Sequence, residues 1–342
     1  MMTTLETLRR LCEADGVSGD EGAASKAAAE LLAAYTSDVK IDDFGSVIAN
    51  IPAEDPNAPL LLLDAHIDQI GMIVTHITDE GFVRVDRCGG IDRRLLLAQE
   101  VVIHGTKPIT GIVGTLPPHL TSGEDTKKVV EMDEVAIDTG YSKEELLRWV
   151  APGDRVTYVS NFTELQNGRV TSRSLDDRAG VASILNALER LKGKPMGFSL
   201  AVVFSCQEET GGFGAASTSF RVKPDAAIAV DVSFAHTADA DERKCGKMGE
   251  GAMIGISPIL NRGMYDELVN LARIRRILWQ PEVMGGRTGT NADEITVTAG
   301  GIRTALLSIP LKYMHTPVEV VQVSDVEAVG DLIAQYVLNC GE

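Results

Sequence analysis

The stretch Leu60-Leu-Leu-Leu-Asp-Ala-His-Ile-Asp68 joins a short apolar run to side chains that commonly bind metals. Residues 60–64 have the length and apolar character of a buried strand. His66 and Asp68 follow that predicted strand directly. In open α/β sheets, ligand sites gather just beyond the carboxyl ends of the strands. The stretch therefore predicts an α/β fold with a polar site at one edge of its sheet.

Metal-type side chains also stand at the ends of other predicted elements. They are Glu208 and Glu209 after the strand 199–205, Asp231 at the end of the strand 226–232, His315 after the strand 305–309, and Asp176 and Asp177 before the helix 179–191. Core residues would stand in mid-strand, so this placement predicts one shared site. Two imidazoles and three carboxylates, without a thiolate, suit zinc, cobalt or manganese. A bridging carboxylate would let two such ions share the site.

Each of these signals is weak when it is taken alone. A His-x-Asp triplet such as His66 to Asp68 is common by chance, and adjacent acids are more often solvated or placed at helix N-termini. His315 stands before Thr-Pro and is compatible with a simple turn. The joint arrangement is what predicts a site. Within it, Glu208 and Glu209 offer one carboxylate to a metal and one to take a proton from water.

The sequence changes in texture between residues 70 and 163. Short β-branched runs alternate there with Gly and Pro, at 71–75, 82–85, 100–104, 109–114 and 155–159. This pattern is typical of a small antiparallel barrel or sandwich. Strands and helices alternate on both sides, and capping-box patterns at 18–21 and 324–327 are expected to open the helices 23–35 and 324–339. The chain of 342 residues is therefore predicted to be an α/β domain with an all-β insertion.

The composition argues against several partners and locations. A formal net charge of −17 would repel nucleic acid and anionic membranes, so neither is expected as a partner. The apolar runs are too short to cross a bilayer and the charged start of the chain lacks a secretory signal, which predicts a cytoplasmic protein. The cysteines form no C-x-x-C pair, so we expect free and mostly buried thiols. They are Cys12, Cys88, Cys206, Cys245 and Cys340.

Five motifs stand in order along the chain. They are Asp64-Ala-His-Ile-Asp-Gln-Ile-Gly71, Ser174-Leu-Asp-Asp-Arg-Ala-Gly180, Gln207-Glu-Glu-Thr-Gly-Gly-Phe-Gly-Ala215, Val230-Asp-Val232 and Ile309-Pro-Leu-Lys-Tyr-Met-His-Thr-Pro317. In these motifs the chain resembles metallopeptidase family 42, which includes glutamyl, deblocking and tetrahedral aminopeptidases. Two further segments, Gly89-Gly-Ile-Asp92 and Val102-Ile-His-Gly105, resemble the insertion domain of that family.

The resemblance implies a two-part architecture. Residues 1–68 and 165–342 would form a zinc-peptidase-like catalytic domain with a mixed central sheet flanked by helices. Residues 69–164 would form the all-β insertion, which acts as a dimerisation domain in that family. The family commonly assembles such dimers into a tetrahedral particle of twelve subunits that admits only short peptides. A homo-oligomer, and a dodecamer in particular, is therefore expected.

The resemblance also implies a role for each site residue. Asp176 would bridge two divalent ions, Zn²⁺ or Co²⁺ and possibly Mn²⁺. His66 and Asp231 would complete one ion site, and Glu209 and His315 the other. Glu208 would be the general base of an aminopeptidase that hydrolyses short peptides through a metal-bridged water. Asp68 would fix the tautomer of His66 by bonding its far nitrogen.

Some features leave alternatives open. Gln69 stands where the family often has an acid, and Asn291 stands where an Asp is expected, which leaves the hold on the peptide N-terminus undefined. A pocket for acidic side chains would need a cation, for which Arg262, Arg287 and Lys312 are candidates. The alternatives are an endoglucanase-type glycoside hydrolase with paired carboxylates, and a catalytically inactive metal-bound scaffold.

Overall fold

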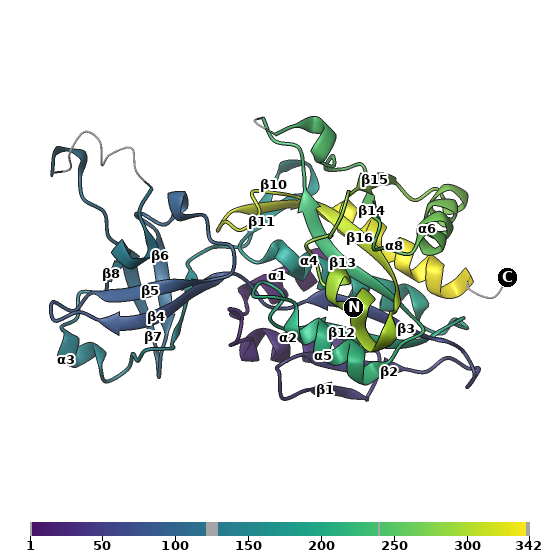
Figure 1. The fold of residues 1–342 in the computed structure, drawn as a ribbon, viewed down its shortest axis with the longest axis horizontal. Coiled ribbons are helices and arrows are strands. Elements are labelled where there is room, and N and C mark those ends of the chain that lie inside the picture. The colour runs from purple at the N-terminus through teal and green to yellow at the C-terminus, as the bar shows by residue number, and fades with distance from the viewer. Residues whose placement is uncertain (1, 121–128, 239, 340–342) are drawn as a thin grey trace.

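The computed structural model describes residues 2–120, 129–238 and 240–339, and its central feature is one large sheet of eleven strands (Figure 1). Its strands are β1 (Val39–Ile41), β2 (Val47–Ile51), β3 (Leu60–His66), β10 (Thr163–Leu165), β11 (Arg169–Ser172), β12 (Ser199–Ser205), β13 (Ala226–Phe234), β14 (Ala252–Ile256), β15 (Trp279–Val283), β16 (Arg303–Lys312) and β17 (Glu319–Gln322). They run in the order β1-β2-β12-β3-β13-β16-β17-β11-β10, with β14 paired to β16 and β15 paired to β14.

The centre of this sheet is parallel. Strands β12, β3, β13 and β16 pair in parallel with one another, whereas β2 is antiparallel to β12, and β14 and β17 are antiparallel to β16. The four central strands are near-continuous apolar runs, as expected for strands that are covered on both faces. Because they are parallel, their carboxyl ends meet at one edge of the sheet. The predicted mixed sheet with flanking helices is confirmed.

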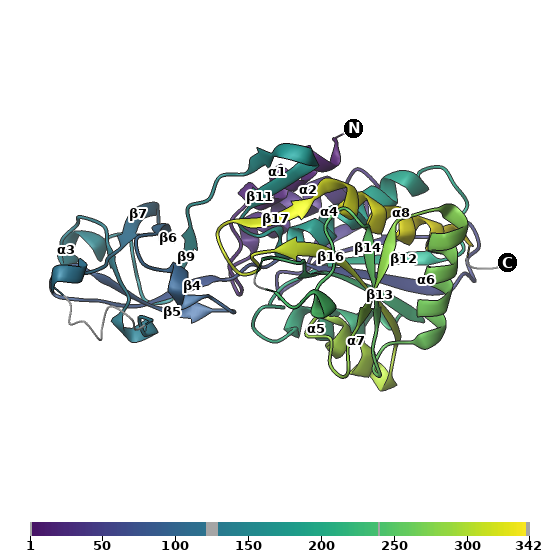
Figure 2. The same ribbon diagram turned by 90° about the horizontal axis from the view of Figure 1, so that it is seen from above.

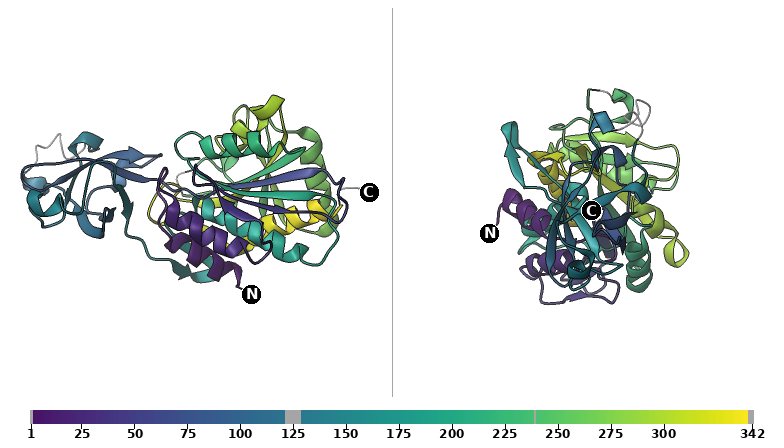
Figure 3. Two further views of the ribbon diagram at one scale, coloured as in Figure 1. Left: turned by 90° about the horizontal axis from the view of Figure 1, so that it is seen from below. Right: turned by 90° about the vertical axis from the view of Figure 1, so that its left-hand side faces the viewer.

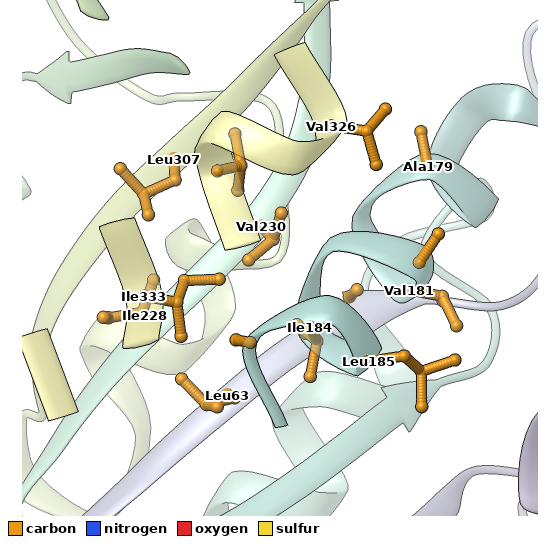
Figure 4. Packing of buried hydrophobic residues seen from close by; sticks show 14 of the residues in the cluster. Leu63, Ala179, Val181, Ile184, Leu185, Ile228, Val230, Leu307, Val326 and Ile333 are labelled. Atoms are coloured by element: carbon orange, nitrogen blue, oxygen red, sulfur yellow. The ribbon is translucent and has the colours of Figure 1, made fainter. Parts of the chain in front are cut away.

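Helices cover both faces of the large sheet (Figure 3). They are α1 (Thr4–Glu13), α2 (Gly22–Leu32), α4 (Leu175–Leu191), α5 (Phe213–Val222), α6 (Arg262–Arg275), α7 (Ala292–Val297) and α8 (Val323–Asn339). The larger core lies between one face and α1, α2, α4, α6 and α8, and Figure 4 shows α4 and α8 packed there on β3, β13 and β16. A smaller core on the opposite face contains residues of α5 and α7.

A second group of strands closes on itself as a six-stranded barrel. The strands are β4 (Gly71–Ile77), β5 (Val83–Cys88), β6 (Glu100–His104), β7 (Pro108–Val113), β8 (Ala136–Asp138) and β9 (Arg155–Tyr158). Figures 1 and 2 show this barrel beside the large sheet, at one end of the long axis. It has its own buried core, which includes Tyr158, whereas Phe162 already belongs to the core of the large sheet. The same segment contains the short α-helix α3 (Lys143–Leu146).

Two local predictions are wrong. The first capping box is absent, because α2 follows Glu21 without a side-chain cap and the Ser18 hydroxyl lies 2.8 Å from that of Thr210 instead. At the last helix, α8 begins one residue before Ser324, and Glu327 accepts a hydrogen bond from Thr4 of α1. In both places a tertiary contact takes the side chain that a cap would use.

Two further features bear on the predicted location and thiols. Cys12, Cys88, Cys206 and Cys245 are free, and the first three are buried, while Cys340 lies outside the described residues. None of the helices in the described ranges combines the length and the apolar character needed to cross a membrane.

Candidate metal centre

The predicted site residues come together at the carboxyl edge of the central strands. They are His66 as the last residue of β3, Glu208 and Glu209 in the loop after β12, Asp176 in the kinked first turn of α4, Asp231 on β13 and His315 in the loop after β16. The peptide bond between Asp176 and Asp177 is cis. Three placements differ from the prediction. β3 runs through His66, which was expected to follow the strand, and β13 continues to Phe234, so Asp231 lies inside it. α4 begins at Leu175 and therefore includes Asp176, which was expected to precede the helix.

The Asp176 carboxylate lies between the two histidines. Its Oδ1 is 3.0 Å from Nε2 of His66, and its Oδ2 is 3.3 Å from Nε2 of His315. Asp231 approaches His66 to 3.8 Å, and Glu209 approaches His315 to 3.3 Å. Two groups of three side chains result, each with its ligand atoms within 4.8 Å of one another, and Asp176 belongs to both. This is the arrangement that a carboxylate shared by two ions requires.

The electrostatics of the cluster favour bound cations. Burial raises the pKa of Glu208 to about 8, against the opposing pull of His66 and with the help of the neighbouring Glu209. Burial alone lowers the pKa of His315, but its hydrogen bonds to Asp176 and Glu209 outweigh this and raise the pKa to about 11. The buried carboxylates of the cluster therefore share two imidazoles as their cationic partners. Divalent cations are the usual partners of such buried charge.

Asp68 holds both His66 and the glutamate loop. Nδ1 of His66 lies 3.1 Å from the Asp68 carbonyl oxygen and 3.4 Å from its carboxylate Oδ1. The same carboxylate accepts hydrogen bonds from the backbone N–H groups of Glu208 at 3.0 Å and Glu209 at 3.1 Å. Asp68 therefore does more than the predicted orientation of one ring. It also holds the backbone of Glu208 and Glu209, and so fixes the point from which their side chains start.

The second histidine is oriented from the barrel segment. Nδ1 of His315 lies 3.0 Å from the carbonyl oxygen of Gly90, which leaves Nε2 directed at Asp176 and Glu209. A Cβ at position 90 would lie 2.5 Å from that Nδ1, so a side chain there would displace the ring. The sequence motif that contains Gly90 pointed to the insertion and not to the site. The close approach of its backbone is visible only in three dimensions.

Glu319, the first residue of β17, is a site residue that sequence reasoning missed. Its Oε2 accepts a hydrogen bond from the backbone N–H of Asp176 at 3.1 Å, and its Oε1 accepts one from the N–H of His315 at 3.0 Å. The side chain is 2% exposed, and burial raises its pKa. One carboxylate thus joins the two segments that carry the shared ligand and the second histidine. Its position four residues after His315 was the only available signal.

We expect Glu319→Gln to weaken metal binding by about 10- to 100-fold, as is usual when a partner that orients a ligand is lost. The amide keeps the size of the carboxylate, but its NH₂ group would face a backbone N–H that then lacks an acceptor. Titration against a chromogenic chelator measures the change. Asp325→Asn is the matched control, because Asp325 is buried and accepts from the N–H groups of Gly249 and Gly251, which lie outside the two ligand groups. Equal metal affinity in both variants would contradict this role for Glu319.

The two unusual residues of the motifs have clear partners. Gln69 accepts a hydrogen bond from the hydroxyl of Ser174. Asn291 donates from Nδ2 to Asp64 at 2.7 Å and to the Ser205 hydroxyl at 2.8 Å. An acid at position 291 would instead bring a second carboxylate against Asp64, so the amide relieves repulsion beneath the site.

Asp177 is buried beside the cluster but belongs to neither ligand group. Its Oδ1 accepts a hydrogen bond from the backbone N–H of Gly180 at 3.0 Å, within the first turns of α4. Burial raises its pKa well above the usual range. Asp177 therefore supports the turn that presents Asp176.

Known proteins resemble this chain in both sequence and structure. Residues 45–332 match the M42 glutamyl aminopeptidase family. The lysyl aminopeptidase of Pyrococcus furiosus is 32% identical over 333 residues, which are 95% of this chain and 94% of that protein. Among solved structures, an aminopeptidase of Desulfurococcus kamchatkensis has a TM-score of 0.92 at 31% identity, covering 98% of this chain and 95% of its own. The TET1 peptidase of Pyrococcus horikoshii has a TM-score of 0.87 at 31% identity, covering 98% and 100%.

These matches agree with the order of the sequence motifs and with the cluster at the edge of the sheet. The family match spans most of the chain, including the central strands of the large sheet and the barrel. The resemblance read from the motifs is confirmed, and the chain belongs to the M42 glutamyl aminopeptidase family.

Proposed function

We propose that this protein is a metal-dependent aminopeptidase that hydrolyses the first peptide bond of short peptides at a two-ion centre. The observation that carries the proposal is the Asp176 carboxylate, whose two oxygens face two different histidines. His66 and Asp231 would hold one ion, and Glu209 and His315 the other, with Asp176 shared. When bound, Zn²⁺, Co²⁺ or Mn²⁺ lowers the pKa of water and polarises the scissile carbonyl.

Glu208 is the proposed general base. It stands next to a proposed ligand but belongs to neither ligand group. Asp68 fixes its backbone N–H, so the start of its side chain is held relative to His66. In this role Glu208 takes a proton from the attacking water and then delivers it to the nitrogen of the departing peptide.

The barrel segment is the proposed assembly domain. We place it at residues 69–164, with residues 1–68 and 165–342 as the catalytic domain. Large apolar side chains are exposed on this segment, among them Ile112, Leu116, Leu120, Val129 and Leu147. Exposed apolar side chains on one part of a protein are typical of interaction surfaces. The P. horikoshii TET1 peptidase can assemble into a tetrahedron or a large octahedral shell, and we infer homo-oligomers, with a dodecamer as the first candidate.

The geometry favours the peptidase over the two alternatives. A glycoside hydrolase needs two carboxylates flanking a bond, and the two histidines at Asp176 would have no part in that chemistry. An inactive scaffold would need the metal ligands alone. It would not need a further carboxylate that stands beside them and belongs to neither ligand group. Glu208 is such a carboxylate.

Removal of metal is the direct test of this proposal. Protein stripped with EDTA is expected to release no product from aminoacyl p-nitroanilides or short peptides, and addition of Zn²⁺, Co²⁺ or Mn²⁺ is expected to restore release. The reason is that the carboxylates and imidazoles supply ligands but no Lewis acid. Stripped protein kept with Mg²⁺ alone controls for divalent charge. Peptide release that persists in EDTA would contradict the proposal.

A further inference from the structure

The loop that carries the proposed base is held by buried side chains from other parts of the chain. Asp68 accepts hydrogen bonds from the backbone N–H groups of Glu208 and Glu209. The residue before them, Gln207, donates its N–H to Oε1 of Glu21 at 3.3 Å. Glu21 directly precedes α2 and has no part in the mechanism proposed above. Its side chain contacts the loop from a point 186 positions earlier in the sequence.

The residues on either side are held in a similar way. Cys206 donates its N–H to the Ser46 hydroxyl at 3.2 Å, and the Thr210 hydroxyl lies 2.8 Å from that of Ser18. Every residue from 206 to 210 thus has a side-chain partner outside the loop. A catalytic group keeps its productive geometry only where supporting hydrogen bonds hold it. The partners of this loop are therefore expected to affect the reaction as well as the stability of the fold.

Gln207 has a backbone conformation that residues with a side chain rarely adopt. Its φ is 58°, in the left-handed region. Such a conformation persists where the surrounding contacts hold the residue in place. The N–H of Gln207 is bonded to Glu21, and its carbonyl oxygen accepts from the N–H of Gly212 at 2.9 Å. Loss of the bond to Glu21 would let Gln207 turn towards a more favourable conformation, and the backbone of Glu208 would turn with it.

Glu21 offers one oxygen atom to two backbone groups. Its Oε1 accepts from the N–H of Gly19 at 2.6 Å as well as from that of Gln207. Burial raises the pKa of Glu21 to about 7, and the charge of Asp68 adds to this rise, against the opposing effect of the bond from Gly19. A negative charge is thus disfavoured at this position. The two bonds need an acceptor oxygen at the end of a side chain of this length.

We propose that Glu21 is a positioning residue for the general base, and that it acts through the backbone of Gln207. The inference rests on the proposed aminopeptidase function and adds a residue to its machinery. Asp68 holds the two peptide groups that flank Glu208, and Glu21 holds the one before them. Three successive peptide groups are therefore fixed, and with them the direction from which the Glu208 carboxylate approaches the attacking water.

Three variants of Glu21, assayed as metal-loaded protein on a panel of aminoacyl p-nitroanilides, test this role. Glu21→Ala removes the acceptor and is expected to lower kcat by about 10- to 100-fold, the effect of displacing a catalytic group by about 1 Å. KM and metal content are expected to stay at the wild-type level. Glu21→Gln keeps an oxygen at the same distance without the charge and is expected to retain most of kcat. Glu21→Asp keeps the charge on a shorter side chain and is expected to lose kcat.

The matched control is Asp325→Ala. Asp325 is also a buried carboxylate that accepts from two backbone N–H groups, those of Gly249 and Gly251, outside the two ligand groups. This variant is expected to lower the melting temperature without lowering kcat. If Glu21→Ala does not fold, the contrast between Glu21→Gln and Glu21→Asp decides, and a loss of kcat that is larger for Glu21→Gln would overturn the inference.

A double-mutant cycle measures whether Glu21 acts through Glu208. In the Glu208→Gln background the base is already absent, so the addition of Glu21→Ala is expected to lower kcat no further. Single-turnover kinetics follow these slow variants. A further loss equal to that in the wild-type background would show that Glu21 acts independently of the base, and would overturn the inference.

The outcomes separate this inference from the function on which it rests. Wild-type kcat in Glu21→Ala would overturn the role of Glu21 and leave the aminopeptidase intact. Equal losses of kcat in Glu21→Ala and Asp325→Ala would do the same, since they would mean general damage. Absence of hydrolysis by the wild-type protein with every substrate and metal would overturn the proposed function, and the role of Glu21 with it.

Discussion

Glu208→Gln is expected to lower kcat by about 10²- to 10⁴-fold, the range for loss of a positioned general base. Glutamine has the size of glutamate, but its amide cannot take a proton from water. The backbone N–H of residue 208 remains bonded to Asp68, so the replaced side chain starts from the same place. Because Glu208 belongs to neither ligand group, metal content is expected to stay at the wild-type level. Single-turnover kinetics and metal analysis on the same sample measure both.

The neighbouring residue supplies the contrast for this experiment. Glu209→Gln removes a carboxylate of the same size one position along, with its backbone N–H also bonded to Asp68. It is expected to lose metal, because Glu209 is one of the three side chains of the His315 group. Full turnover in Glu208→Gln would remove Glu208 from the mechanism. Loss of metal from Glu208→Gln but not from Glu209→Gln would mean that Glu208 is the ligand and Glu209 the general base.

Asp176→Ala is expected to release both ions and to lower turnover by at least about 10⁴-fold, since a bound ion contributes several kcal/mol to the transition state. Asp176 is the one side chain common to both ligand groups, so its loss affects both. His66→Ala and His315→Ala each remove a ligand from one group and are expected to lower metal content less. Metal stoichiometry after dialysis, with thermal unfolding to check the fold, distinguishes the three variants.

A histidine outside the centre controls for general damage. His104 on β6 bonds to Thr157 within the barrel and belongs to neither ligand group. His104→Ala is therefore expected to keep full metal content and activity. Unchanged metal content in both His66→Ala and His315→Ala would contradict the ligand assignment.

The meeting of the site residues could be predicted because it depends on strand direction. His66, Glu209 and Asp231 follow or end apolar runs with the length and composition of central parallel strands, and the carboxyl ends of such strands share one edge. Residue type then indicated the chemistry. The exact position of Asp231 could not be predicted, because β13 continues through the polar Ser233 to Phe234 as part of a pairing with β16. Composition alone does not reveal that pairing.

Residues whose role depends on a hydrogen bond to a segment far away in the sequence were not predicted. Glu319 bonds to the N–H of Asp176, which lies 143 positions earlier, and Gly90 bonds to a ring 225 positions later. No local pattern marks such contacts. Short strands of mixed composition such as β10 and β17 were missed for a related reason, since only their neighbours in the sheet make them strands. At Ser18 a local capping pattern is present, but a contact with the distant Thr210 takes the hydroxyl and the cap does not form.

The contact between the Gly90 carbonyl and His315 connects the barrel segment to the candidate metal centre at the edge of the large sheet. His315 takes its tautomer from a residue outside the large sheet, so cutting the barrel away would leave the ring free to rotate. A minimal catalytic core made by excising the barrel is therefore expected to lose affinity for one ion, together with the subunit contacts that we propose for the barrel. Thermodynamic linkage makes the relation mutual: contacts that hold the barrel in place strengthen metal retention, and metal loading in turn strengthens those contacts. With assembly contacts on the barrel, as proposed, dilution and chelation should act together on the oligomer.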